Sequence, residues 1–160
     1  MKTGITGHQE LGPQEDVQRL VRAMKTVVER YRVTEGFTCL ARGADQLYAD
    51  ILCAQGLPFV VVVPCENYIS VFATARDRER FERLLRSASQ TIMLPFLSPS
   101  ETAFYEAGKR VVDLSGAMIA AWDGKPARGL GGTADIVKYA LSKGRRVIQI
   151  VPESGKVIEL

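Results

Sequence analysis

The sequence lacks the features that would place it among disulfide-rich or metal-binding proteins. Its three cysteines, Cys39, Cys53 and Cys65, are odd in number and form no CxxC pair. We interpret them as buried free thiols in a reducing compartment, and we expect a cytoplasmic protein without a metal or cofactor. The alternative is a nucleophilic role for Cys65, which follows Pro64 at the end of a predicted strand.

Long apolar runs and blocks of like charge are also missing. No apolar run approaches the ~20 residues that a membrane-spanning helix needs, and the first residues have a strand pattern rather than that of a signal peptide. The formal net charge of +3 is mild and its charges are dispersed. We therefore expect no membrane partner, and the missing basic arm disfavours a nucleic-acid partner.

The chain shows no repeats, low-complexity segments or linker, so its 160 residues predict a single domain, residues 1–160. Strand and helix patterns alternate. Strands are predicted over 2–6, 37–41, 58–63, 91–94, 116–122 and 146–151, and the tail to Leu160 is expected to add an edge strand. Helices are predicted over 15–32, 45–55, 75–88, 101–113 and 134–143. This alternation favours parallel strands with helices on both faces, which is a three-layer, doubly wound, Rossmann-like α/β fold with a mainly parallel central sheet.

One stretch, residues 112–144, combines a buried strand, a glycine-rich loop and a helix. Gly131 and Gly132 would let a ligand approach the backbone closely. Thr133 is the expected N-cap of a helix whose free N–H groups would face that ligand. This combination favours an anionic group, most simply a phosphate.

The loops after the other strands should open at the same edge of the sheet, where ligands bind in folds of this class. They supply Gly7 and His8, then Arg42, Gly43 and Asp45, then Pro64, and finally Asp123 and Gly124 before the glycine-rich loop. Each has a structural alternative: His8 as a solvated loop residue, Gly43 as a packing residue, Arg42 in a surface ion pair, and Asp45 favoured only by its helix dipole. Trp122 is expected in the core or in a pocket wall.

The usual nucleotide fingerprints are missing from these loops. The chain has no GxGxxG and no GxxxxGK[ST]. Conventional dinucleotide sites and P-loop triphosphate sites are therefore disfavoured.

Three segments resemble a known family. Gly4–His8, Ala41–Asp45 ("ARGxD") and Met118–Gly124 followed by Gly131-Gly132-Thr133-Ala134-Asp135 ("LIAxxDG…GGTxD") are similar to motifs of the SLOG superfamily. That group joins the DNA-processing protein A proteins to the Lonely Guy, "lysine decarboxylase-like" proteins. The resemblance implies a Rossmann-like fold that binds a nucleotide or nucleotide-derived ligand, with phosphate at the glycine-rich loop. It also implies a homodimer or a higher homo-oligomer.

Some Lonely Guy proteins are phosphoribohydrolases whose PGGxGTxxE motif carries a catalytic glutamate. This chain departs from that motif, because Ile136 stands at the glutamate position. Asp135 lies one residue earlier, about 100° away around a helix. Asp123, Asp45 and Glu66 are other carboxylates that would be able to act on a glycosidic bond.

The resemblance also implies His-Arg at residues 8 and 9, where this chain has His8-Gln9, and that difference would remove one phosphate contact.

The sequence thus predicts a nucleotide-binding protein that acts as a sensor or ligand-binding module. The alternative is a nucleotide N-glycosidase, either a phosphoribohydrolase or a deoxyribosyltransferase-like enzyme, with Asp123 and Asp135 as its catalytic candidates. The predicted ligand- and phosphate-binding residues are Gly7, His8, Arg42, Gly43, Asp45, Pro64, Asp123, Gly124, Gly131, Gly132 and Thr133.

Overall fold

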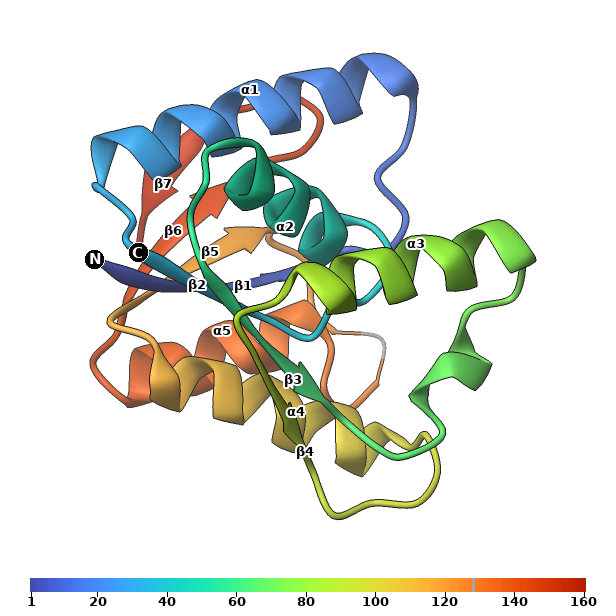
Figure 1. The fold of residues 1–160 in the computed structure, drawn as a ribbon. Helices are drawn as coiled ribbons and strands as arrows, with labels where there is room; N and C mark the ends of the chain where they lie inside the picture. The colour runs from blue at the N-terminus through green and yellow to red at the C-terminus, as the bar shows by residue number, and fades with distance from the viewer. Residues whose placement is uncertain (128) are drawn as a thin grey trace.

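A seven-stranded sheet forms the centre of the molecule (Figure 1). The computed structural model describes residues 1–127 and 129–160, so Arg128 of the predicted glycine-rich loop lies outside the described residues. The strand order is β4-β3-β2-β1-β5-β6-β7. Within the described residues, strands β1 to β6 pair in parallel and β7 alone is antiparallel. The strands are β1 (Lys2–Gly7), β2 (Glu35–Thr38), β3 (Phe59–Val63), β4 (Gln90–Met93), β5 (Ala117–Ala121), β6 (Arg146–Ile150) and β7 (Val157–Glu159).

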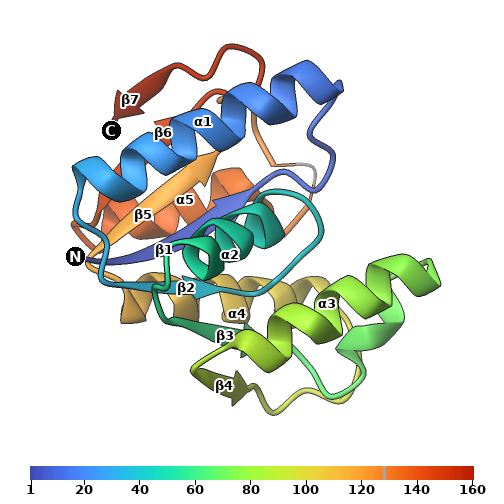
Figure 2. The ribbon, with the colours of Figure 1, turned by 45° about the horizontal axis from the view of Figure 1, so that its top comes forward.

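Five α-helices cover the two faces of this sheet, as two views show (Figures 1 and 2). Helices α1 (Gln14–Arg30), α2 (Ala44–Ala54) and α3 (Ala75–Ser87) lie on one face, and α4 (Glu101–Leu114) and α5 (Thr133–Ser142) lie on the other. A short 3-10 helix, η1 (Tyr68–Val71), precedes α3. The predicted three-layer, doubly wound α/β fold is confirmed.

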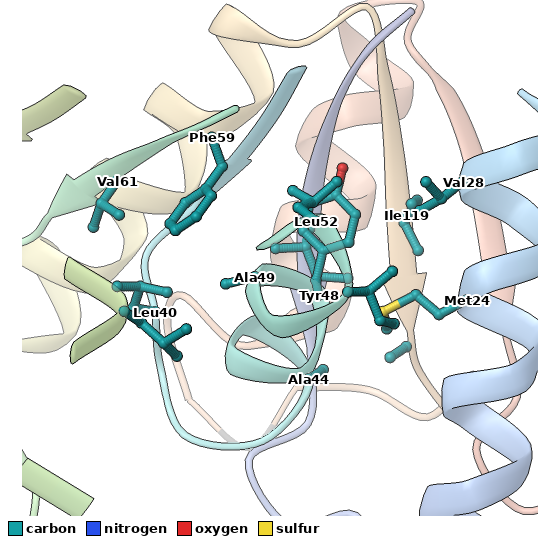
Figure 3. Packing of buried hydrophobic residues seen from close by; sticks show 14 of the residues in the cluster. Met24, Val28, Leu40, Ala44, Tyr48, Ala49, Leu52, Phe59, Val61 and Ile119 are labelled. Atoms are coloured by element: carbon teal, nitrogen blue, oxygen red, sulfur yellow. The ribbon is translucent and has the colours of Figure 1, made fainter. Parts of the chain in front are cut away.

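The hydrophobic core is divided by the sheet into two layers. Every residue of β3 is buried, and its side chains alternate between the layers, as the pleat of a strand requires. Phe59 and Val61 belong to the layer beneath α1, α2 and α3, and Val60 belongs to the layer above α4 and α5. In Figure 3, Tyr48 and Leu52 of α2 lie among side chains from β3, β5 and α1.

The strand after α1 and the start of α5 differ from their predicted bounds. Strand β2 ends at Thr38, not at residue 41, because the Asp45 carboxylate accepts the Cys39 N–H and the Thr38 hydroxyl accepts the Leu40 N–H. The expected N-cap at Thr133 is wrong. Gly132 has the extended dihedrals of an N-cap residue, and Thr133 is already helical.

The cysteine prediction is correct for only part of the set. Cys65 is fully buried and Cys39 is half-buried, whereas Cys53 is exposed on α2. In the described part of the chain, no helix has the length and apolar character of a membrane span.

Strands β1 and β5 are neighbours, yet the helices that follow them, α1 and α5, lie on opposite faces of the sheet. Their loops therefore diverge, and a crevice opens at the carboxyl ends of the strands, as expected at a topological switch point.

Truncation of Leu52 tests the larger core layer. Leu52 is fully buried, whereas Leu141 on α5 is 43% exposed. We expect Leu52→Ala to lower the free energy of unfolding by about 2–5 kcal/mol, because the cavity it leaves closes only in part. The control Leu141→Ala should change it by less than about 0.5 kcal/mol. Urea denaturation measures both, and equal effects would contradict this packing.

Candidate functional site

A cavity of about 910 Å³ opens at the carboxyl ends of β1, β2, β3 and β5. Its walls come from the loops after those strands, from η1, and from the first turns of α4 and α5. Nine of the residues predicted for the site line it, namely Gly7, His8, Arg42, Asp45, Pro64, Asp123, Gly131, Gly132 and Thr133. Residues far apart in the sequence, such as His8 and Asp123, which are 115 positions apart, thus share one space.

The N-terminus of α5 forms one wall of this cavity. Its N-cap, Gly132, makes no side-chain capping hydrogen bond. Helices α3 and α4 differ, because the side chains of Thr74 and Ser100 cap them. The first N–H groups of a helix have no acceptor within it and attract anions. The wall that contains Gly132 and Thr133 is therefore suited to a phosphate or a carboxylate.

Gly131 shapes the loop before α5. Its φ is +86°, and a Cβ there would lie 2.9 Å from the backbone nitrogen of Tyr105, so only glycine fits against α4. The Gly131 N–H donates to the Asp135 carboxylate over 3.2 Å. Asp135 is thereby turned back onto its own loop and does not line the cavity, whereas Ile136, the next residue, does. Of the two catalytic candidates, only Asp123 faces the cavity.

His8 and Asp123 meet at the switch point between β1 and β5. The His8 Nε2 atom lies 3.2 Å from the Asp123 Oδ1 and 3.2 Å from the Asp123 backbone nitrogen. One nitrogen cannot serve both at once. When the Nε2 atom of His8 carries no hydrogen, it accepts the Asp123 N–H. When it carries one, it donates to the carboxylate. The pair therefore has two hydrogen-bonded arrangements, which differ in whether Nε2 carries a hydrogen.

The Asp123 carboxylate is held in its ionised form. The Lys125 N–H donates to its Oδ1 over 3.0 Å. This hydrogen bond and the nearby His8 lower the pKa of Asp123, against a smaller opposing effect of burial. An anionic oxygen therefore faces the cavity beside the anion-attracting end of α5.

Asp45 lies deeper in the cavity wall. Its side chain is only 6% exposed, and its Oδ2 accepts hydrogen bonds from the Thr38 hydroxyl (3.1 Å) and the Cys39 N–H (3.0 Å). Burial raises the pKa of Asp45 to about 6, although these hydrogen bonds act in the opposite direction. The neighbouring Arg42 is paired with the Glu10 carboxylate and lies 3.9 Å from that of Asp77.

Two predicted binding glycines, Gly43 and Gly124, do not line the cavity. Gly43 has a φ of +90°, and a Cβ there would lie 2.4 Å from the His8 carbonyl oxygen. Its role is the close packing of α2 against the loop after β1, where the Ala44 N–H donates to that same carbonyl. Gly124 occupies a turn with a φ of +85°.

Several residues that line the cavity were not predicted from the sequence. Glu101, Phe104 and Gly108 line it from α4. Their i, i+3, i+7 spacing marks one face of a helix, and that signal was present in the sequence. Tyr68 and Val71 line it from η1, and Phe72 lines it from the next position, in a segment too short to have a readable period.

The structure also locates Trp122, Cys65 and Glu66, for which the sequence left alternative roles open. Trp122 lines the cavity, packs against the core layer of α4 and α5, and donates its indole N–H to the Lys125 carbonyl. Cys65 is fully buried and burial raises the pKa of its thiol, and Glu66 is exposed outside the cavity lining. Among the described residues, no group of three His, Cys, Asp or Glu side chains is placed to hold a metal ion.

The buried Asp45 predicts a dependence of stability on pH. Its pKa is about 6 in the folded protein, above its ordinary value of 3.8, so between these values the folded chain binds more protons than the unfolded chain. The stability contribution of Asp45 is therefore largest at low pH and falls by about 3 kcal/mol as pH rises from about 3 to about 7.

The amide of the Asp45→Asn variant does not titrate in this pH range. The unfolding free energy of the unmodified protein, relative to this variant, should fall over that pH window and stay constant above it. Thermal or urea denaturation at several pH values measures the difference, and a difference independent of pH would contradict the burial of this carboxyl.

No protein-family model matches the chain, and no curated protein sequence matches it. Solved structures do match. DNA processing protein A from Streptococcus pneumoniae has a TM-score of 0.68 and 16% identity, and the match covers 94% of this chain and 50% of that one. The same protein from Helicobacter pylori, described for its single-stranded DNA binding mode, has a TM-score of 0.67 and 13% identity, with 93% and 64% covered.

The Moco carrier protein of Chlamydomonas rheinhardtii has a TM-score of 0.54 and 13% identity, and the match covers 92% of this chain and 74% of that one. This chain thus spans half of one DNA processing protein A chain and 64% of the other. Identities this low concern the fold alone. The chain has the Rossmann-like fold that these SLOG-type proteins share.

Proposed function

We propose that this protein binds a nucleotide or a nucleotide-derived ligand in the cavity, as a sensor or ligand-binding module. The observation that carries this proposal is the uncapped N-terminus of α5, with Gly131 and Gly132, facing a cavity at the switch point of the sheet. The cavity volume of about 910 Å³ lies within the range typical of small-molecule sites. The phosphate lies on the first N–H groups of α5, beginning with that of Thr133, as the family resemblance also suggests.

The charges around the cavity favour a ligand of mixed character. His8 and Lys125 supply cationic or potentially cationic groups, while Asp123 and Glu101 supply carboxylates. A free inorganic anion would meet those carboxylates unfavourably. A nucleotide instead places its phosphate at α5 and its hydroxyl and amino donors at the carboxylates.

An N-glycosidase is the second candidate, and the His8–Asp123 pair is the observation that favours it. An ionised carboxylate beside an imidazole provides a general base and a proton carrier within one cavity. Asp123 takes the role of the family's missing glutamate in this proposal. Assembly as a homodimer or a higher homo-oligomer stays a proposal based on the resemblance.

The phosphate site is tested by replacing Thr133, which lines the cavity, with the isosteric valine. Thr133→Val removes a hydroxyl donor, so we expect the Kd for AMP to rise about tenfold or more. The affinity for adenosine, which has no phosphate, should be unchanged. The control is Thr102→Val, an exposed position on α4 outside the cavity lining. Isothermal titration calorimetry measures all three proteins.

Failure of the unmodified, folded protein to bind any of AMP, ADP-ribose, NAD or cyclic nucleotides would overturn the nucleotide proposal. Single-stranded oligonucleotides belong in the same experiment, because the Helicobacter pylori protein of this fold is described as binding single-stranded DNA. Oligonucleotide binding with no response to mononucleotides would instead assign the cavity to a nucleic acid.

The enzymatic alternative predicts the release of free base from nucleoside monophosphates. Asp123→Asn should lower that release by at least about 100-fold, because the amide cannot accept a proton. Asp135→Asn should leave it nearly unchanged, since Asp135 is bonded within its own loop. Chromatographic detection of the base measures both. Absence of base release from every nucleotide in the panel would leave the binding proposal alone.

A further inference from the structure

Asp45 is a buried carboxyl whose hydrogen bonds leave one of its oxygens for a ligand. It lines the cavity while its side chain is only 6% exposed. The Thr38 hydroxyl and the Cys39 N–H both donate to Oδ2, and the Ala41 N–H also faces the carboxyl. A carboxylate has about four acceptor positions, so Oδ1 retains the capacity to accept a hydrogen bond from the cavity.

The loop around Asp45 holds this carboxyl in a fixed position. The Leu40 N–H donates to the Thr38 hydroxyl, and the Gln46 amide donates to the Leu40 carbonyl. Leu40 itself has a positive φ of 54°. The side chain therefore cannot turn to the solvent without breaking this network. A ligand whose hydrogen-bond donor does not reach this fixed carboxyl would lose that hydrogen bond without compensation.

The surroundings of Asp45 within the cavity are apolar and aromatic. Tyr68, Phe72 and Phe104 line the same space, and the rings of Tyr68 and Phe104 lie 6.3 Å apart between centroids. The part of a ligand that reaches Asp45 must therefore be largely apolar and still carry a hydrogen-bond donor. A nucleobase has both properties.

The sheet order gives the distance from the phosphate site. Going along the sheet edge, β5 with the glycine-rich loop is followed by β1 with His8 and then by β2 with Asp45. Two strand spacings amount to about 10 Å. That distance accommodates a phosphate at α5, a pentose beside His8 and Asp123, and a base edge at Asp45.

We propose that Asp45 accepts a hydrogen bond from an exocyclic amino group of the ligand's base, and so selects amino-bearing bases over bases with a carbonyl at that position. This inference rests on the proposed nucleotide binding. An ionised carboxylate only accepts hydrogen bonds, so it attracts an amino group and repels a carbonyl oxygen. Burial in the cavity wall strengthens both effects.

The test compares AMP with IMP, and CMP with UMP, by isothermal titration calorimetry at pH 7.5. We expect the unmodified protein to bind the amino member of at least one pair tenfold or more tightly. In Asp45→Asn, the amide oxygen replaces Oδ2 toward Thr38 and Cys39, and the amide NH₂ group faces the cavity. The preference should therefore disappear or reverse toward the carbonyl base, which a purely structural role of Asp45 would not produce.

The matched control is Asp50→Asn, on the same helix but outside the cavity lining, where the carboxylate pairs with Arg80. This variant should keep the preference of the unmodified protein. Circular dichroism tests whether both variants are folded. If Asp45→Asn is not, the AMP/IMP and CMP/UMP comparison in the unmodified protein still tests the preference for amino-bearing bases.

Equal affinities within both pairs would overturn the role of Asp45 and leave nucleotide binding intact. A preference that Asp45→Asn retains would do the same. Discrimination only between AMP and 2′-deoxy-AMP, lost in Asp45→Asn, would assign the carboxyl to a sugar hydroxyl and overturn the base assignment. Binding of no nucleotide by the unmodified protein would overturn the proposed function and this inference together.

Discussion

The pairing of β1 with β5 is the contact on which the candidate site depends. Five residues of each strand are in register, from Thr3 opposite Ala117 to Gly7 opposite Ala121. The register continues past the strand ends, where the His8 N–H donates to the Ala121 carbonyl. Because α1 and α5 leave these two strands toward opposite faces, the loops part and a crevice forms between them. A slip of the register would separate His8 from Asp123.

The site and the stability of the fold make opposing demands on Asp45. Burial of an ionised carboxylate costs free energy, and the pKa raised to about 6 measures that cost. The same side chain closes the loop after β2 by accepting the Thr38 and Cys39 donors, which returns part of the cost. The same carboxyl also lines the cavity, and that geometry is the basis of the role proposed for it.

The shared fold does not fix the chemistry of this protein. One protein with the same fold is described for its single-stranded DNA binding and another as a Moco carrier protein, and fold likeness alone carries no function. The features specific to this chain are local. Ile136 lines the cavity, Asp135 accepts a hydrogen bond from the Gly131 N–H, and Asp123 faces His8. These placements are the basis for proposing binding at α5 and, in the enzymatic alternative, a catalytic role for Asp123.

The sequence by itself determined the fold class, the alternation of strands and helices, and the loops that would meet at one edge of the sheet. It did so because burial patterns and turn residues are local signals, as the valine-rich β3 and the motif at Gly131 and Gly132 show. It was unable to decide the direction of Asp135, the packing role of Gly43 or the aromatic wall at Tyr68. Those depend on which side chains approach from elements distant in the chain, and only the tertiary structure decided them, because a side chain's surroundings are set by the packing of neighbouring strands and helices.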